Sequence, residues 1–327
     1  MKSYNIGIND AGQRVDKFVA KLCPDLPKSM LYKYIRIKRI KVNKKRTEIG
    51  YVLKENDLIE LYINDEFFAE NEADMSFMES DGIIDAVYED ENILIVNKPA
   101  GIIVHEDNNI KGNTLVDNIK KYLYNKGEYD PQAENTFAPA LCNRIDRNTE
   151  GLVIAAKTAV ALREMAEKIR TGQMRKYYYT LVMGTPYPEK ADLFAYLIKN
   201  DAENKVQIFD EHVDGAREIH TEYKTVESFG WGSILEINLH TGRPHQIRAH
   251  LAHIGYPVAG DGKYGNPGFN KKTALSHQVL SAYKLVFAFE DNTGTLGYLN
   301  GKTVCLDKNK CSVFKTAKRV GGKYNEL

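Results

Sequence analysis

LCNRIDRNTEG, residues 141–151, places Asp146 between Arg144 and Arg147. A turn-forming NTEG leads from there into the apolar residues 152–156, which predict a short buried strand. The carboxylate therefore lies in a basic loop at the mouth of a sheet. An aspartate has an ordinary pKa of about 3.9, and nearby arginines would lower that pKa further and orient the side chain. By itself the pattern is more typical of a surface ion pair, so its meaning depends on the rest of the chain.

The charge of the chain is balanced overall but unevenly distributed. Its 327 residues contain 45 Lys and Arg against 44 Asp and Glu. Residues 1–64 hold fourteen basic and seven acidic residues, whereas residues 65–82 hold seven acidic residues and no basic one. This asymmetry predicts an N-terminal domain, residues 1–64, that contacts a polyanion, followed by an acidic linker, residues 65–82.

The compartment is indicated by cysteine usage and by the lack of long apolar segments. The four cysteines are scattered and form no CxxC pair, which favours a reducing environment; they are Cys23, Cys142, Cys305 and Cys311. The first residues contain no apolar signal segment, and no apolar run approaches the roughly 18 residues of a membrane span. We expect a soluble, cytoplasmic protein with no contact to a membrane.

Two helices are predicted in the N-terminal domain. The second, with Ser29 as its expected N-cap, buries Leu31, Tyr34 and Ile35. Charged helix faces usually serve only solvation, but here a surface of one sign extends over two elements. Contact with a phosphate backbone is therefore the better interpretation, and the residues expected to make it are Lys33, Arg36, Lys38, Arg39 and Lys45.

Strands and helices alternate through the remaining chain. Two short strands are predicted within 52–63, a buried strand at 93–96, helices at 114–124 and after Thr158, and strands at 175–182 and 234–239. Within 175–182, Tyr178 points to the opposite face from the tyrosines on either side of it. Pro244 suits the first turn of a helix over about 245–254, which brings His245 and Arg248 to neighbouring positions.

Several chemistries lack their usual motifs. His240, His245, His250 and His253 suggest a metal, but no HExxH occurs and no carboxylate follows before Asp261. There is no GxSxG nucleophile elbow and no glycine-rich nucleotide site. In an RNA-binding context histidines and arginines more often contact phosphate, so His245 is assigned to RNA binding. A reaction on RNA without metal or organic cofactor remains, using a carboxylate, a tyrosine and an arginine.

The sequence resembles two known families. RVDKFVAKL, SMLYKYIRIKRIKVNKK and LKENDLIELYI, within residues 13–64, resemble an S4 RNA-binding domain. Four ordered blocks resemble the RluA family of pseudouridine synthases, over about residues 83–312; they are YEDENILIVNKPAGIIVH, NRIDRNTEGLVIAAKT, RKYYYTLVMG and LHTGRPHQIRAHLAHIGYPVAGDGKYG. With the S4-like segment in front, the chain is similar to the branch that modifies large-subunit ribosomal RNA.

The resemblance implies roles for individual residues. Asp146 matches the catalytic aspartate, for which carbon 1′ of the ribose is the favoured site of attack, although attack on the base has also been considered. Arg144 matches the arginine that replaces the flipped uridine in the helix, and Tyr178 the tyrosine that stacks on the flipped base. Arg248 matches the basic partner of the aspartate. We therefore expect Arg248, and not the neighbouring Arg147, to orient Asp146. Lys98 and Pro99 match a block that shapes the cleft.

Three positions depart from the family pattern. Asn143 stands where His is usual, Glu150 where Ser is usual, and Ser281 where His is common. None is one of the four role-bearing residues, but Asn143 and Glu150 flank the catalytic loop. Fine substrate preference is therefore not transferred.

The resemblance also implies the architecture. We expect an α+β protein with a small S4 domain and a catalytic domain, residues 83–312, on a long mixed, mostly antiparallel sheet with a central cleft, then a basic tail, residues 313–327. The expected partner is RNA, 23S ribosomal RNA first, bound by a monomer without a nucleotide cofactor. Two alternatives remain open: a non-catalytic RNA-binding or ribosome-assembly factor on the same fold, and a metal-dependent RNA hydrolase.

Overall fold

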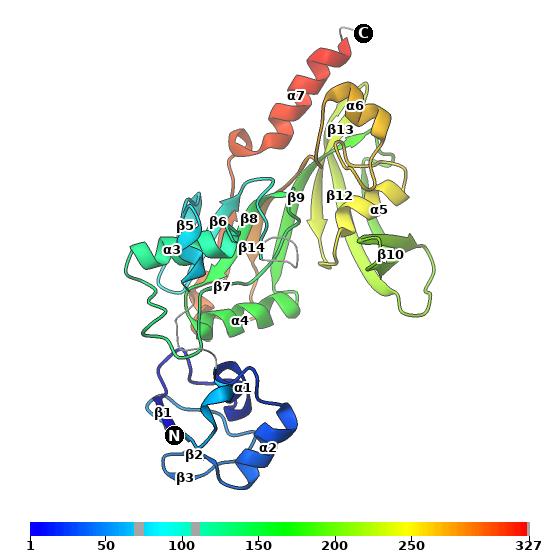
Figure 1. Cartoon of the computed structure of the whole chain (residues 1–327). Coiled ribbons are helices and arrows are strands. Elements are labelled where there is room, and N and C mark those ends of the chain that lie inside the picture. Colours follow the sequence, from blue (N-terminus) through cyan, green and yellow to red (C-terminus); the bar gives the residue numbers. More distant parts are fainter. Residues whose placement is uncertain (69–74, 106–111, 326–327) are drawn as a thin grey trace.

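A small N-terminal unit and a large unit built on one long sheet make up the molecule (Figure 1). The computed structural model describes residues 1–68, 75–105 and 112–325. The N-terminal unit (residues 1–68) has an antiparallel four-stranded sheet in the order β1-β4-β2-β3, and two helices. Its elements are β1 (Lys2–Asn5), α1 (Val15–Leu22), α2 (Lys28–Arg36), β2 (Ile40–Val42), β3 (Lys45–Arg46) and β4 (Leu58–Leu61).

Both predicted N-terminal helices are present, with corrections at their edges. The predicted stripe of α2, Leu31, Tyr34 and Ile35, is buried in the core of this unit. The prediction of Ser29 as N-cap was wrong: the helix begins at Lys28, because Pro27 holds φ at −56° and turns the chain into the helix two residues earlier. Residues 52–63 supply one strand, β4, instead of two, and Val52 makes only an isolated bridge to Arg14.

The large unit is an 11-stranded mixed sheet within the described residues, ordered β11-β10-β12-β13-β9-β14-β8-β6-β5, with β15 beside β14 and β7 beside β8. Every pair is antiparallel except β14 with β8, so the predicted α+β class and mostly antiparallel sheet are confirmed. The strands are β5 (Ala86–Glu89), β6 (Ile93–Lys98), β7 (Ala140–Leu141), β8 (Glu150–Ala156), β9 (Met174–Met183), β10 (Lys190–Asn200), β11 (Lys205–Phe209), β12 (Arg217–Phe229), β13 (Gly232–Leu239), β14 (Leu280–Phe287) and β15 (Thr303–Cys305).

Helices cover both faces of this sheet, because its central strands are apolar on both sides. Along β6, Ile93 and Ile95 enter one core, and Leu94 and Val96 enter the other. The first core is closed by α4 (Ala159–Arg170), α6 (Pro267–Thr273) and α7 (Ser312–Asn325), and the second by α3 (Leu115–Asn125) and α5 (Gln246–His253). In the described part of the chain no helix is both long and apolar enough to cross a bilayer.

Gly151 lies where β8 pairs in parallel with β14, opposite Ala282. Its φ of +117° suits glycine, and a Cβ built there would lie 2.2 Å from the carbonyl oxygen of Ala282. The two backbones can approach this closely only because residue 151 has no side chain. This contact fixes the end of the loop that carries Asp146.

Parts of the segments predicted as linker and tail pack into the large unit instead. Phe77, inside the predicted acidic linker, is fully buried and packs edge-on against Tyr124 of α3. Residues 69–74 of that linker lie outside the described residues. The predicted basic tail forms α7, whose Val313, Ala317 and Val320 are buried in the first core. Apolar residues at helical spacing explain the correction, because they give the basic segment a face to bury.

Specific polar contacts hold the N-terminal unit against the large unit. The buried carboxylate of Asp10 accepts hydrogen bonds from Asn135 Nδ2 at 2.6 Å and from Thr136 Oγ1 at 2.8 Å. Asn9 Oδ1 accepts a hydrogen bond from the backbone N–H of Ala159, the first residue of α4, at 3.0 Å. The N-terminal unit is thus docked on the helix that follows β8 (Figure 1).

Candidate active site

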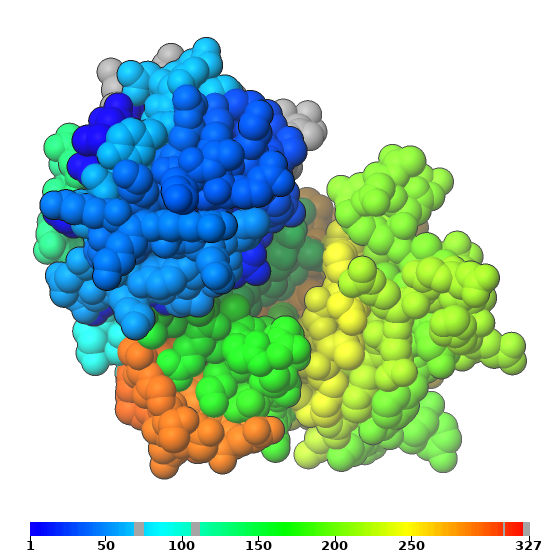
Figure 2. Space-filling model, turned by 90° about the horizontal axis from the view of Figure 1, so that it is seen from below, coloured from blue at the N-terminus to red at the C-terminus, as the bar shows by residue number. Residues whose placement is uncertain are grey.

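A cleft of about 400 Å³ opens beside the middle of the large sheet. It is lined by the loop before β8, by β9, by the β10–β11 hairpin and by the segment from Leu239 to Arg248. Figure 2 shows the hollow between the blue N-terminal unit with green α4 and the yellow segment that contains α5. Five of the predicted site residues meet in this cleft, namely Arg144, Asp146, Tyr178, His245 and Arg248.

The loop that carries Asp146 is tied at both ends. At its start, Asn143 Oδ1 accepts a hydrogen bond from the backbone N–H of Ile154 at 2.8 Å. After Asp146, its own carbonyl accepts a hydrogen bond from the N–H of Thr149 at 3.0 Å. Ile145 is buried in the core beneath the loop. The carboxylate therefore projects from a backbone that is fixed before it, beneath it and after it.

Lys98 joins this loop to the neighbouring NKPAG turn. Its side chain is fully buried, and Nζ donates to the carbonyl oxygens of Arg147 at 2.8 Å, Pro99 at 2.9 Å and Ile102 at 3.0 Å. Burial lowers its pKa to about 8, against the opposing attraction of Asp146 and Glu150. Lys98 thus holds the loop that carries Asp146 against the NKPAG turn and is not among the residues that line the cleft; that its block shapes the cleft stays a prediction.

Arg248 bridges two carboxylates. Its Nη1 donates to Asp146 Oδ2 at 2.6 Å, while Nε and Nη2 donate to the two oxygens of the buried Asp261 at 2.6 and 3.0 Å. Burial opposes the charge of the guanidinium, but Asp261 and Asp146 raise the pKa of Arg248 overall. Burial likewise opposes ionisation of Asp261, yet Arg248 and two backbone N–H groups hold the pKa of that carboxyl below its ordinary value.

The two arginines next to Asp146 in sequence point elsewhere. Arg147 Nε donates to the carbonyl oxygen of Gly101 at 3.1 Å, so its side chain serves the NKPAG turn. Arg144 is exposed on the rim of the cleft. The preference for Arg248 over Arg147 as partner of Asp146 is confirmed by these distances.

Tyr178 forms part of the cleft wall from β9. Its side chain leaves the strand on the face opposite to Tyr177 and Tyr179, as the alternation predicted, and only 6% of the residue is exposed. Burial, together with the nearby charge of Asp146, raises the pKa of the Tyr178 hydroxyl. At neutral pH the residue offers an aromatic ring and a protonated hydroxyl to the cleft.

His245 immediately precedes α5 in a left-handed conformation with φ of 52°. The helix predicted over about 245–254 is confirmed at Gln246–His253, but Pro244 lies before its N-cap, His245, and not in its first turn, because the left-handed residue breaks the helical path. His245 Nδ1 lies 2.9 Å from the hydroxyl of Tyr264. Burial lowers the pKa of the imidazole, Asp146 opposes that shift, and Arg248 adds to it.

Three residues in the cleft or in contact with its lining were not singled out from the sequence. Asp261 and Tyr264 lie in GDGKYG and contact Arg248 and His245 respectively. Lys176 lines the cleft next to Tyr178, and burial lowers its pKa. A buried arginine must be paired with carboxylates. The sequence could have pointed to Asp261 because a buried Arg248 would need a carboxylate partner in addition to Asp146.

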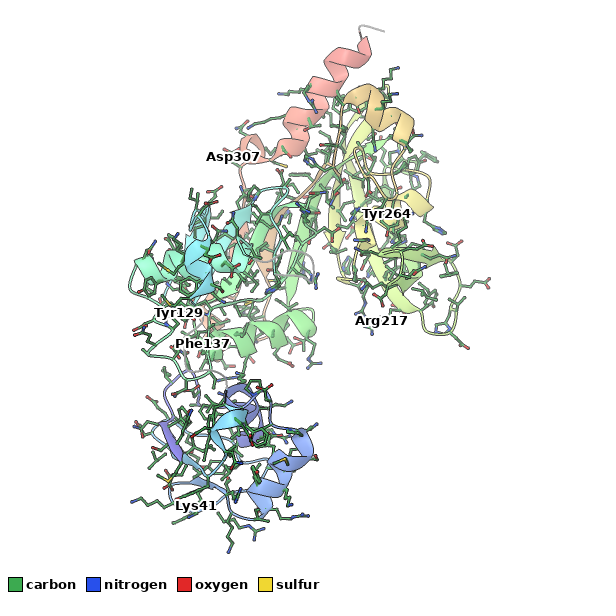
Figure 3. The ribbon with its side chains drawn as sticks, viewed as in Figure 1. Lys41, Tyr129, Phe137, Arg217, Tyr264 and Asp307 are labelled. Atoms are coloured by element: carbon green, nitrogen blue, oxygen red, sulfur yellow. The ribbon has the colours of Figure 1, made fainter. Side chains whose placement is uncertain are left out.

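The basic residues of the N-terminal unit lie apart from the cleft. Lys33 and Arg36 line a groove of about 440 Å³ together with Tyr32 and Arg46. Lys38 and Arg39 line a second groove of about 480 Å³ that also includes Lys41, which is labelled in Figure 3. Lys45 is exposed on β3. The structure thus separates a basic surface from the cleft.

The histidines considered as metal ligands are dispersed. His250 is buried with Nδ1 3.1 Å from Thr221 Oγ1, and burial lowers its pKa to about 4. His253 pairs with Asp210 at 2.8 Å. A different set could hold a metal ion among the described residues. It consists of Asp192, His220 and His240, whose possible ligand atoms lie within 4.8 Å of one another. The histidines at 240, 245, 250 and 253 do not form one site.

The geometry suits nucleophilic chemistry on a planar ring. One carboxylate oxygen is held by a guanidinium, and a buried tyrosine ring lies in the same cleft. Such a carboxylate can attack an electrophilic carbon, and an aromatic side chain can stack on a base taken out of its helix.

Comparison with known proteins finds one family. Residues 92–253 match the family model described as RNA pseudouridylate synthase. An uncharacterised RNA pseudouridine synthase of Mycoplasma capricolum is 33% identical over 310 residues, which cover 93% of this chain and 97% of that protein. The ribosomal large subunit pseudouridine synthase C of Vibrio parahaemolyticus is 32% identical over 288 residues, covering 86% of this chain and 87% of its own.

A solved structure supports the fold. Human RNA Pseudouridylate Synthase Domain Containing 4 superposes with a TM-score of 0.56 over 72% of this chain and 92% of its own, at 19% sequence identity. At that identity the likeness concerns the arrangement of the sheet and helices alone.

Proposed function

The chain belongs to the RNA pseudouridylate synthase family, and from that membership we propose that it converts uridines of large-subunit ribosomal RNA to pseudouridine with Asp146 as nucleophile. As a member of this family, the chain is an isomerase that acts on RNA. The ribosomal target is proposed because a ribosomal large subunit enzyme matches most of this chain. The observation that carries the role of Asp146 is its 2.6 Å contact with Arg248 inside the cleft.

The reaction follows from the groups in the cleft. A uridine leaves its helix, at a cost of a few kcal/mol, and its base packs against the ring of Tyr178 while Arg144 at the rim fills the vacated place. Asp146 attacks carbon 1′ of the ribose, the bond from that carbon to N1 breaks, and uracil leaves with the electron pair. The base turns, its carbon 5 bonds to carbon 1′, the aspartate ester is released, and the hydrogen of carbon 5 is lost as N1 gains a proton.

Arg248 would keep the attacking carboxylate aimed at the ribose. The guanidinium holds one oxygen of Asp146 and is itself anchored by Asp261. A charge-assisted hydrogen bond of this kind is stronger than a neutral one and fixes direction as well as distance. Isomerisation requires neither a redox partner nor a group donor, so the proposal includes no nucleotide cofactor.

The N-terminal unit is proposed to be an S4 domain that binds RNA outside the cleft. Its support is the pair of basic grooves, in which lysines and arginines accompany tyrosine rings. Phosphate contacts there would supply affinity without reading the sequence. We further propose that the enzyme works as a monomer in the cytoplasm, where ribosomal RNA is found.

Replacing Asp146 with Asn tests the central proposal. Pseudouridine is mapped across total RNA from cells that have the protein, lack it, or carry Asp146→Asn, and RNA binding of the purified proteins is measured in parallel. We expect the variant to bind RNA and to leave specific uridines unmodified. Asp192→Asn, outside the cleft, is the matched control. Modification that persists in Asp146→Asn would contradict the role of Asp146.

The pseudouridine map and an EDTA treatment address the two alternatives. A ribosome-assembly factor on this fold would leave the pseudouridine map unchanged when the gene is deleted. A metal-dependent hydrolase would lose activity in EDTA, whereas the proposed isomerase keeps it.

A further inference from the structure

A chain of hydrogen bonds defines which nitrogen of His245 carries the proton. The backbone N–H of Val206, on β11, donates to the hydroxyl oxygen of Tyr264 at 2.8 Å. The same hydroxyl lies 2.9 Å from His245 Nδ1. A phenol has one hydrogen to donate, and the direction that satisfies all three groups runs from Val206 through Tyr264 to Nδ1. Nδ1 is then the acceptor, and the neutral ring carries its hydrogen on Nε2.

Tyr264 is itself held in place by the turn that anchors Arg248. Its backbone N–H donates to Asp261 Oδ1 at 3.1 Å, and the Arg248 guanidinium lies over its ring with 5.4 Å to the ring centre. Figure 3 shows Tyr264 in the lobe that carries α5. The short turn from Asp261 to Tyr264 therefore orients Arg248 through a carboxylate and His245 through a hydroxyl.

The backbone of His245 is held in an uncommon conformation. A non-glycine residue with φ of 52° carries a cost of about 1 kcal/mol that the surroundings must offset. The imidazole lines the cleft that contains Asp146, and no described residue accepts a hydrogen bond from Nε2. Burial lowers the pKa of the ring, which favours its neutral form. An unused donor is thus presented beside the nucleophile.

A neutral donor suits a carbonyl oxygen better than a phosphate. Phosphates are matched by the positive charges that already surround the cleft, including Arg144 and Lys176. When the bond from carbon 1′ to N1 breaks, the electron pair left on uracil spreads onto O2 and O4. A hydrogen-bond donor fixed before the reaction stabilises that charge, and a neutral imidazole can serve in this way.

We propose that His245 donates from Nε2 to a carbonyl oxygen of the flipped uracil and stabilises the negative charge on the departing base, with its tautomer set by Tyr264 and Val206. The inference rests on the proposed function and assigns His245 to the base, where the sequence suggested RNA binding in general. It makes His245 a catalytic residue and Tyr264 a positioning residue.

Sulfur substitution in the RNA tests the contact. Transcripts containing the modified uridine are prepared with uridine, 2-thiouridine or 4-thiouridine throughout, and single-turnover rates are measured with saturating enzyme. With ordinary RNA, we expect His245→Ala to lower the rate about tenfold to a hundredfold. One of the two sulfur substitutions should slow the wild type and have no further effect on His245→Ala, because sulfur is a poor acceptor.

Tyr264→Phe tests the tautomer. It keeps the ring beneath Arg248 and removes the hydroxyl, so the rate should fall in the wild-type background and not in the His245→Ala background. His253→Ala, on the same helix and outside the cleft, is the matched control and should keep the wild-type rate.

The outcomes separate the inference from the function. If the wild type forms pseudouridine and His245→Ala either keeps its rate or loses it with both sulfur effects intact, the inference is overturned while the function stands. If Tyr264→Phe slows His245→Ala as much as it slows the wild type, the role of Tyr264 is overturned. A wild type that forms no pseudouridine overturns the proposed function itself.

Discussion

Arg248 gives Asp146 a single hydrogen bond, from Nη1 to Oδ2 at 2.6 Å, and commits Nε and Nη2 to Asp261. No described residue donates to the other oxygen of Asp146, Oδ1. One oxygen is therefore anchored and the other is available for attack. An arginine suits this arrangement because its planar fork can satisfy two carboxylates in fixed directions.

Replacing Arg248 with Lys should abolish most activity although the charge is retained. A lysine ammonium is a single point of charge and cannot hold both oxygens of Asp261 while it reaches Asp146. We expect the single-turnover rate to fall by about a hundredfold or more, equivalent to roughly 3 kcal/mol of barrier. RNA affinity should change little. A variant within threefold of the wild-type rate would show that Asp146 does not need a forked partner.

Gly151→Ala should destabilise the protein by more than the backbone strain of an alanine with positive φ. The new Cβ would meet the carbonyl oxygen of Ala282 at 2.2 Å in addition to the cost of φ at +117°. Gly172→Ala is the control, because φ there is +76° and nothing lies within 4 Å. Urea unfolding should show a loss of about 1 kcal/mol for the control and several times that for Gly151→Ala. Equal losses would mean that β8 and β14 can separate without cost.

His250 should make the protein sensitive to mild acid. Its folded pKa is about 4, below the ordinary value of about 6.5 expected in the unfolded chain. Between these values the unfolded chain binds a proton that the folded chain does not, so stability falls as the pH drops from about 6.5 to 4. The loss should approach about 3 kcal/mol at the lower end.

Urea unfolding at pH 7 and pH 4.5 measures this dependence. His250→Gln should flatten it, and His277→Gln, at an exposed position away from His250, should not. If the His250→Gln protein has the same pH dependence as the wild type, other groups govern the acid response.

The basic groove that contains Lys33 and Arg36 should set the salt dependence of RNA binding. Each lost phosphate contact reduces the slope of log affinity against log salt by about 0.7 to 0.9. Lys33→Ala with Arg36→Ala should therefore lower the slope by about 1.5 and leave the rate at saturating RNA unchanged. Lys315→Ala with Lys318→Ala, on α7, removes equal charge elsewhere and is the control. An unchanged slope in the groove variant would contradict RNA contact there.

Local patterns predicted the elements that carry the site. Strict alternation placed Tyr178 opposite its neighbouring tyrosines, and apolar residues after Gly151 predicted β8. The four ordered blocks supplied the family and with it the sheet. These features are encoded over a few residues, so sequence alone was sufficient.

Features that depend on distant contacts were missed. The partnership of Asp261 with Arg248 joins a glycine-rich turn to a helix, and nothing in either segment specifies the distance between them. The left-handed backbone of His245 was not predicted, because the preceding Pro244 is common in the first turn of helices and indicated an ordinary helix start. Residues 313–325 were predicted to be a tail because of their basic charge. Their apolar face makes them a packed helix, and the sheet that this face packs against is distant in sequence.

Helix α4 links the docked N-terminal unit to the chemistry. Its first N–H is capped by Asn9, and Ile169, near its other end, lines the cleft. Twelve helical residues span about 18 Å and resist bending. The helix therefore sets the distance between the N-terminal unit, which carries the basic grooves, and the cleft that contains Asp146. Under the proposed function, the enzyme would select uridines by their distance from the anchored RNA as well as by their immediate surroundings.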